Sequence, residues 1–289
     1  MAGIKEFNTK IKSLKNTKKI TKTMKMVSAS KLRRAQEARL NAKAYADHIT
    51  ALTSRISASC SLAPHPLLIE HKPVKRAHIL IFASDRGLCG AFNLNCFRQV
   101  NAWLKENRSR FEKIELSFCG KRGFNFFRKI ENIKTFYENV TGKPKFQDAE
   151  KIGKDLADAY IKGDYDEVYL AYNSFISPLV QKTTFEKILP LDPKSLSKGE
   201  TIKPTDYIFE PTDADLLEFL IPQFLYFKIF FALLENSAGE HGARMSAMDN
   251  ATKNSSDLMT KYTLLRNRAR QAKITTELTE IVAGSEALN

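Results

Sequence analysis

The sequence is poor in cysteine and shows no sign of a secretory signal. Four cysteines in 289 residues are too few for a disulfide framework, and none of them belongs to a CxxC pair of the kind that binds zinc or carries redox chemistry. The first residues, MAGIKEF, lack a charged segment followed by an apolar one, so we expect no signal peptide. We therefore expect a reducing compartment.

No hydrophobic run is long enough for a membrane span. The most apolar stretch, residues 219–234, contains Pro222, Gln223 and Lys228. It falls short of the roughly 20 apolar residues that cross a bilayer. We expect a buried helix here.

Basic charge is abundant and unevenly distributed. The chain has 46 Lys and Arg against 32 Asp and Glu, a net charge of +14, and residues 1–40 hold twelve of the basic side chains against two acidic ones. Such an excess predicts an anionic partner. Nucleic acid, anionic lipid and an acidic protein surface all satisfy that prediction, and composition does not choose among them.

Both ends of the chain have helical patterns. Residues 4–59 contain neither proline nor glycine, and apolar residues recur at helical spacing from Ile4 through Leu14, which predicts a helix of about 80 Å. Residues 213–283 predict a second helix of about 105 Å. Helices of this length need partners, so we expect an antiparallel coiled coil in which the C-terminal helix projects past the N-terminal one.

The middle of the chain alternates between short apolar runs and helical patterns. Strands are expected at residues 78–84, 114–119, 134–140, 167–172 and 180–189, with helices at 92–106, 123–129 and 146–161. This order predicts a parallel or mixed sheet flanked by helices. The fold class is therefore α/β with long terminal helices, and a loop is expected at residues 190–204.

No motif predicts catalysis. The segment DRGLCGAFN, residues 85–93, has glycines between a strand and a helix, yet it lacks the spacing of dinucleotide-binding or P-loop motifs. We expect a tight turn here rather than nucleotide binding, and Cys89 within it is expected to be packed rather than reactive. The histidines have no metal-ligand spacing, so no cofactor and no metal are expected.

The basic N-terminal helix fits two kinds of partner. A basic region of this kind can follow the phosphates of DNA, but apolar residues interrupt it and it lacks the Asn and Arg clusters suited to base edges. It can equally lie against acidic loops of a protein. The residues alone thus leave open a nucleic-acid-binding coiled coil, a nucleotide-dependent enzyme built on the middle domain and a non-catalytic protein that binds other proteins.

Three segments closely resemble the gamma subunit of the rotary F-type ATP synthase. They are NTKKITKTMKMVSASKLRRAQ (residues 16–36), DRGLCGAFN (85–93) and RNRARQAKITTELTEIVAGSEAL (266–288). The resemblance implies a coiled-coil shaft over residues 1–60 and 211–289 and a Rossmann-like foot domain over residues 75–210. It also implies a non-catalytic central-stalk rotor of a proton-translocating enzyme that binds no nucleotide or nucleic acid. The implied partners are a ring of alpha and beta subunits, the epsilon subunit and the c-subunit ring.

The resemblance also implies roles for individual residues. Lys22, Met24, Lys25 and Arg244 match positions that face an acidic lever region of beta. Arg270, Gln271, Thr275 and Glu277 match polar positions that engage loops of beta, while Ile274, Leu278 and Ile281 are expected to face the companion helix or an apolar bearing. Tyr207 and Glu210 match the foot region that meets the c ring.

Two departures from the family pattern stand out. Gly239 and Gly242 occupy positions where the family usually has small non-glycine residues, and each glycine costs a helix about 1 kcal/mol relative to alanine, so local softness is expected there. Residues 191–204 do not resemble the dithiol insertion of chloroplast gamma subunits, so we expect no thiol regulation. Without a transit peptide, we expect a peripheral protein at the cytoplasmic face of a bacterial inner membrane.

Overall fold

A computed structural model of the chain describes residues 3–59, 65–191 and 213–286. The chain divides into two compact units. Residues 1–28 and 245–289 form one, called the helix-pair unit, and residues 29–244 form the other, called the sheet unit. Helices α1 (Ile4–Ser59) and α6 (Asp213–Glu286) each contribute to both units.

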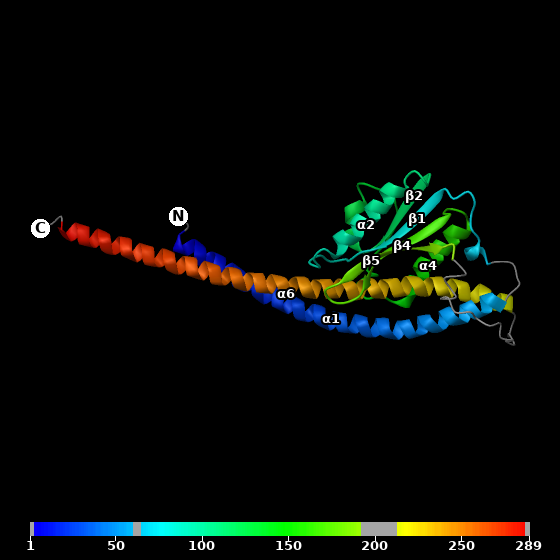
Figure 1. The fold of residues 1–289 in the computed structure, drawn as a ribbon, viewed down its shortest axis with the longest axis horizontal. Helices are drawn as coiled ribbons and strands as arrows, with labels where there is room; N and C mark the ends of the chain where they lie inside the picture. The colour runs from blue at the N-terminus through cyan, green and yellow to red at the C-terminus, as the bar shows by residue number, and fades with distance from the viewer. Residues whose placement is uncertain (1–2, 60–64, 192–212, 287–289) are drawn as a thin grey trace. The chain divides into compact units, whose positions relative to one another are not determined.

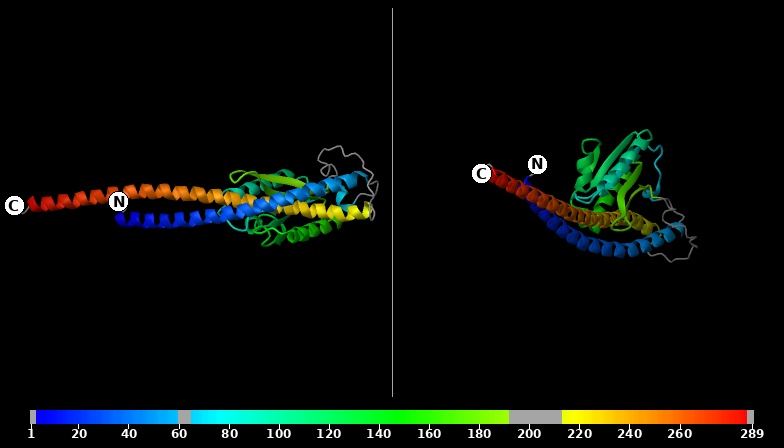
Figure 2. Two further views of the ribbon diagram at one scale, coloured as in Figure 1. Left: turned by 90° about the horizontal axis from the view of Figure 1, so that it is seen from below. Right: turned by 60° about the vertical axis from the view of Figure 1, so that its left-hand side comes forward.

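In the helix-pair unit, α1 and α6 run antiparallel, side by side (Figures 1 and 2). Lys25 Nζ lies 2.6 Å from Asp249 Oδ1, and the hydroxyls of Thr21 and Thr252 are 2.7 Å apart. Nearer the N-terminus, the rings of Phe7 and Tyr262 are 6.3 Å apart. Since falling residue numbers on α1 meet rising ones on α6, the antiparallel direction follows from the contacts themselves.

The sheet unit contains a five-stranded mixed sheet in the order β3-β2-β1-β4-β5. Strands β1 to β4 are parallel, and β5 pairs with β4 in the antiparallel direction. The elements are η1 (Pro66–Leu68), β1 (Arg76–Phe82), α2 (Phe92–Asn107), β2 (Lys113–Cys119), α3 (Lys121–Phe127), β3 (Ile133–Tyr137), α4 (Phe146–Ile161), β4 (Glu167–Phe175) and β5 (Gln181–Leu189).

Helices cover both faces of this sheet (Figure 1). Ile79 and Ile81 of β1 point to a core that contains Phe97 and Val100 of α2. The alternate residues Leu80 and Phe82 point to the opposite core, which is formed with α4 and with residues 221–233 of α6. Because both faces are buried, the strands are apolar on both sides, as is usual for parallel sheets.

The predicted fold class is confirmed. Strands and helices lie where the alternating pattern places them, and helix α4 has the predicted bounds. The predicted division into a shaft and a foot stays a prediction. Most apolar residues of the stretch 219–234 are buried as expected, although Phe219 is 64% exposed. Among the described helices none is apolar over a stretch long enough to cross a bilayer.

Gly239 and Gly242 allow α6 to approach the sheet closely. A methyl group on Gly239 would lie 2.9 Å from the ring of Phe92, and one on Gly242 would lie 3.1 Å from Cα of Pro178. A side chain at either position would displace its neighbour. The two glycines therefore have a packing role, and the expected softness is not needed to explain them.

One buried carboxylate joins α6 to two other elements of the sheet unit. Glu235 on α6 accepts a hydrogen bond from Arg39 Nη1 of α1 at 2.6 Å, from the backbone N–H of Phe175 at 2.6 Å and from the hydroxyl of Ser174 at 3.2 Å. The Glu235 side chain is 4% exposed and that of Arg39 24%. A carboxylate so buried is stable only with donors of this kind around it.

A second buried polar residue has no such partners. Both ring nitrogens of His78 on β1 lack a hydrogen-bond partner in the described part of the chain, and the ring packs 4.4 Å from that of Tyr165. Burial, with a smaller contribution from the Lys134 cation, lowers the pKa of His78 to about 3. The ring is therefore neutral in the fold at physiological pH.

We expect Glu235→Ala to lower the free energy of unfolding by about 3–5 kcal/mol, because it leaves Arg39 and a backbone N–H without their acceptor. Urea denaturation followed by circular dichroism measures the change. Glu37→Ala is the matched control, since it removes the exposed ion pair Arg33–Glu37 and should cost less than about 1 kcal/mol. Equal losses in the two variants would contradict a special role for Glu235.

We also expect the protein to lose stability in mild acid through His78. Its folded-state pKa is depressed, so its contribution is fully present above pH 6.5 and is lost as the pH falls toward about 3, at about 1.4 kcal/mol per pH unit. His241, whose pKa burial lowers to about 4, adds a similar loss. His78→Leu should reduce the slope of stability against pH by about 1.4 kcal/mol per unit between about pH 6 and pH 4.5. An unchanged slope, as expected for the control His48→Gln on the exposed surface of α1, would contradict this assignment.

Candidate functional site

In the turn between β1 and α2, polar groups are hydrogen-bonded to other groups of the same chain. The carboxylate of Asp85 accepts hydrogen bonds from the backbone N–H of Lys121, at the start of α3, and from the hydroxyl of Thr141. Leu88 and Gly90 have left-handed backbones, with φ of 64° and 60°. A negative charge thus already stands at the carboxyl edge of the sheet, where doubly wound folds otherwise bind phosphate groups.

Arg244 of α6 binds the same turn. Its guanidinium donates to the carbonyl oxygens of Gly87 at 3.1 Å and Arg86 at 2.9 Å, and it forms an ion pair with Glu240 at 2.7 Å. The turn therefore presents carbonyl acceptors, which repel phosphate. Its role in the described structure is to hold α6, in agreement with the expectation of a tight turn.

Cys89 lies buried within this turn. Its thiol is near the hydroxyl of Ser84 and the amide of Asn93, and burial raises the pKa of the Cys89 thiol. A protonated, enclosed thiol is a poor nucleophile. This agrees with the expectation that Cys89 is packed rather than reactive.

The predicted beta contacts on α1 differ in their surroundings. Lys22 is exposed, Met24 is half-buried, and Lys25 is paired with Asp249 of the same chain. The hydrogen bond from Lys25 holds the pKa of the Asp249 carboxyl below its usual value. Arg244, the fourth residue of this predicted set, has only 10% of its side chain exposed and is engaged with the turn described above.

The predicted beta contacts on α6 all lie on exposed surface. Arg270, Gln271, Thr275 and Glu277 are exposed, and their contacts within the chain are local ones between neighbouring turns of the helix. They lie near the C-terminal end of α6, and the first residues of α1 line a pocket with Lys273 and Thr276 of the same segment. Their donors and acceptors are therefore accessible to a partner.

The apolar residues of the same segment are also exposed. Ile274, Leu278 and Ile281 are 47%, 58% and 67% exposed. None of the three is buried against α1. The expectation that they face the companion helix or an apolar bearing therefore stays a prediction, and their exposure favours the bearing. Large apolar side chains gathered on a surface are typical of a site that a partner covers.

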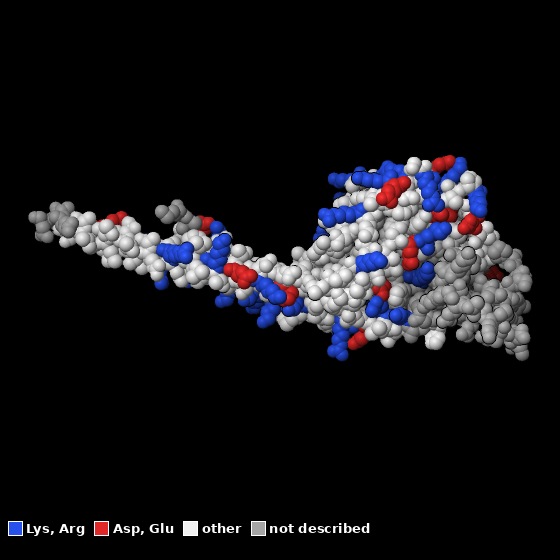
Figure 3. Space-filling view, in the orientation of Figure 1, with Lys and Arg blue, Asp and Glu red and all other residues white. Residues whose placement is uncertain are grey.

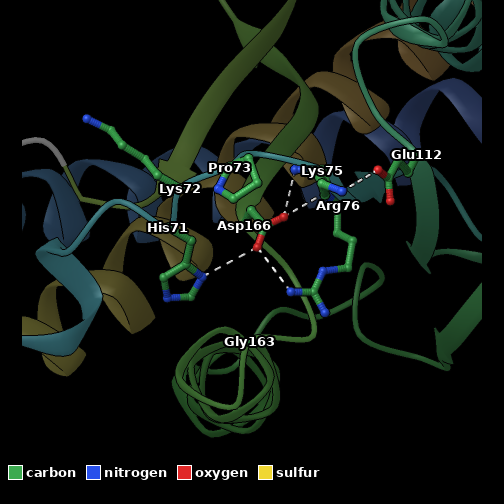
Figure 4. Close-up of a pocket in the computed structure, with 8 residues that line it drawn as sticks. All are labelled: His71, Lys72, Pro73, Lys75, Arg76, Glu112, Gly163 and Asp166. Carbon is green, nitrogen blue, oxygen red and sulfur yellow. Dashed lines mark hydrogen bonds and ion pairs between the residues drawn. The ribbon is translucent and has the colours of Figure 1, made fainter.

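Sequence patterns did not reveal a pocket at the amino edge of the sheet (Figure 4). It has a volume of about 740 Å³ and is lined by His71, Lys72, Pro73, Lys75, Arg76, Glu112, Gly163 and Asp166. Asp166 organises this pocket: its carboxylate accepts hydrogen bonds from the backbone N–H groups of Lys75 and Arg76 and from the Arg76 guanidinium. These donors hold the pKa of Asp166 below its usual value even though burial opposes the shift.

Two expectations concern residues beyond these sites. Tyr207 and Glu210, the predicted c-ring contacts, lie outside the residues that the structure describes. Within the described ranges, no group of three or more His, Cys, Asp or Glu side chains is placed to hold a metal ion.

The sequence is similar to known proteins over its whole length. A family model described as ATP synthase matches residues 3–288. The ATP synthase gamma chain of Pelotomaculum thermopropionicum is 43% identical over 289 residues, covering 100% of both chains. That of Geobacter sp. strain M21 is 41% identical over 288 residues, covering 100% of this chain and 99% of the relative.

Solved structures show the same fold. The central stalk and c-ring structure of the Tetrahymena thermophila mitochondrial ATP synthase contains a chain that is 25% identical, with a TM-score of 0.61, covering 80% of this chain and 99% of that one. A chain of the Euglena gracilis mitochondrial ATP synthase rotor is 20% identical, with a TM-score of 0.67, covering 94% and 98%. On these similarities of sequence, the chain belongs to the family of ATP synthase gamma chains.

Proposed function

We propose that the chain is the central-stalk rotor subunit of a proton-translocating ATP synthase and that it couples rotation of a c ring to conformational change at catalytic beta subunits. In this proposal it is not itself catalytic. It turns inside a ring of alpha and beta subunits and rests, with an epsilon subunit, on the c ring at the cytoplasmic face of a bacterial inner membrane. Family membership and bacterial relatives support the assignment.

The asymmetry of the helix-pair unit is the structural observation that carries this function. Residues 4–28 of α1 hold eight basic side chains and one acidic one, whereas residues 245–286 of α6 hold six and five. The pair thus presents a strongly basic side and a nearly balanced one. Figure 3 shows basic side chains distributed along the lower part of this helix pair.

Such asymmetry has a direct consequence for three identical beta subunits. Chemically identical subunits hold different nucleotide states only when something gives each a different interaction free energy. A shaft with unlike sides provides that difference. Rotation by one third of a turn then exchanges the three states among the subunits.

The predicted contacts divide into two groups within this proposal. Lys22, Met24 and Lys25 present charge and apolar surface to the acidic lever region of beta. Arg270, Gln271, Thr275 and Glu277 engage beta loops beside an apolar bearing that covers Ile274, Leu278 and Ile281. Arg244 contributes through the turn it holds, because its own donors are used there.

Co-purification tests the assignment. The full chain, expressed with alpha and beta subunits of the same bacterium, should be recovered in a stable complex with ATPase activity. After reconstitution with the membrane sector, that complex should pump protons when ATP is added. Failure to recover the chain with alpha and beta, or tight sequence-dependent binding to DNA instead, would contradict the rotor assignment.

We expect Lys22→Glu with Lys25→Glu to weaken coupling more than folding. Exposed ion pairs contribute about 0–1 kcal/mol each to stability, so the double variant should assemble, yet it should pump fewer protons per ATP hydrolysed. Proton pumping and hydrolysis are measured on the same reconstituted complex. The control changes Lys151 and Lys154, two exposed residues of α4, to Glu. Normal pumping by the incorporated Lys22 and Lys25 variant would show that this contact is wrongly assigned.

We expect Gln271→Leu and Arg270→Ala each to slow both hydrolysis and synthesis by about tenfold or more. A hydrogen bond to a charged group contributes about 1.5–3 kcal/mol, and its loss in the rate-limiting state raises the barrier accordingly. Thr276→Ala, a neighbouring exposed position whose hydroxyl bonds only to the Ala272 carbonyl, is the control. Wild-type turnover in fully assembled variants would mean that coupling depends on the shape of the shaft alone.

A further inference from the structure

The amino edge of the sheet has its negative charges inside and its positive charges outside. Glu115 on β2 lies 2.8 Å from Lys113 Nζ and 4.0 Å from Lys134 Nζ. Glu167 on β4 binds Arg110 at 3.0 Å and lies 3.6 Å from Lys187 Nζ. Each carboxylate thus holds two cations.

Asp166 completes this arrangement. It binds Arg76 at 3.3 Å and lies 3.6 Å from His71 Nδ1. We call the surface cations of this edge the basic rim: Lys75, Arg76, Arg110, Lys113, Lys134 and Lys187. Sheet topology brings them together, because β1, β2 and β4 begin at this edge and the antiparallel β5 ends here.

These three carboxylates are much less exposed to solvent than the cations paired with them. The side chains of Glu115, Asp166 and Glu167 are at most 9% exposed, whereas the cations paired with them are 38–55% exposed, apart from the half-buried His71. The buried carboxylates reduce repulsion among the cations and fix their positions. Since a lysine has three donors and an arginine five, each cation retains donors that face solvent.

Exposed acids on this edge are few. Glu112 pairs with Lys75 at 2.6 Å, and Glu70 pairs with Lys72 at 3.6 Å. The pocket of Figure 4 opens between Lys72, Lys75 and Arg76. Among the paired side chains of this edge, seven cations but only two carboxylates are exposed to solvent.

We propose that the basic rim binds the phosphate groups of anionic phospholipid headgroups at the membrane surface. The cations are spread along a whole sheet edge and do not converge on one point, which suits many headgroups better than a single phosphate. The edge is also where the chain leaves β5, at Leu189, for the segment that contains Tyr207 and Glu210. The inference rests on the proposed function in this respect, because the rotor role places that segment on the c ring.

Vesicle binding by the full chain tests the proposal. Vesicles of phosphatidylcholine with about one third phosphatidylglycerol should bind the protein, and pure phosphatidylcholine vesicles should not. A cation near an anionic membrane surface contributes about fivefold to partition. The variant Lys75→Gln, Lys134→Gln, Lys187→Gln should therefore bind the anionic vesicles about 100-fold more weakly.

This triple variant is chosen to remain folded. Glu115 keeps Lys113, Glu167 keeps Arg110, and Glu112 is exposed, so no buried carboxylate loses its closer cation. Unfolding in urea checks this directly. A second triple variant with Arg at the same three positions should bind within about threefold of the wild type, because it keeps the charge.

A matched control separates the rim from net charge. Lys12→Gln, Lys15→Gln, Lys19→Gln removes three exposed charges of α1 and should weaken binding by less than about fivefold. An equal loss in both triple variants, or no loss in the rim variant, would overturn the proposal. So would displacement by inorganic phosphate at constant ionic strength, or equal affinity for a soluble glutamate peptide, which would indicate a free-phosphate site or an acidic protein partner.

The outcome is separable from that of the rotor assignment. The rotor proposal places the contacts with beta subunits on residues of α1 and α6 and on none of the basic rim. A chain that assembles but does not bind anionic vesicles refutes the rim proposal alone, whereas one that binds vesicles through the rim but never assembles refutes the rotor role alone.

Discussion

The buried carboxylate of Glu235 constrains the rest of the sheet unit. It needs several donors at once, and it finds them on α1 and on the end of β4. Gly239 and Gly242 follow at spacings of four and three, which place them on the same side of α6. The charge fixes where α6 lies, and the two glycines let it lie close to Phe92 and Pro178. One residue of this helix face thus determines the position of α6, and two others determine how closely α6 approaches the sheet.

The turn at the carboxyl edge of the sheet is built differently from the nucleotide site of a doubly wound fold. A nucleotide site at the carboxyl edge needs backbone N–H groups that point toward an anion. Here Arg244 draws the carbonyl oxygens of Arg86 and Gly87 toward itself, and Asp85 occupies the N-terminus of α3. The edge that binds ligands in other doubly wound folds is used to attach a helix.

Local patterns predicted the elements of this fold but not the contacts between distant charges. Alternating apolar runs identified the strands, because β1 and β4 are buried on both faces. In contrast, Arg39 and Glu235 are 196 residues apart, and neither stands out from the other charged residues of its helix. Glu167 offered a weak signal of a buried ion pair, since it is a charged residue at the start of the apolar strand β4. The sequence predicts local softness at Gly239 and Gly242, but a glycine in a helix is equally compatible with close packing, and only its neighbours in the fold distinguish the two.

The chain uses basic charge in two physically different ways. Residues 4–28 contain eight basic side chains and one acidic one. Most of these basic side chains can therefore change conformation to pair with an acidic surface of a partner. At the amino edge of the sheet, every cation of the basic rim except Lys75 is paired with a buried carboxylate, which restricts the position of the cation and weakens its electrostatic field. Mobile charges suit a contact that must change at each step of a rotation. Fixed charges suit a surface that keeps one orientation toward an anionic layer, and the buried carboxylates are what make that fixation stable.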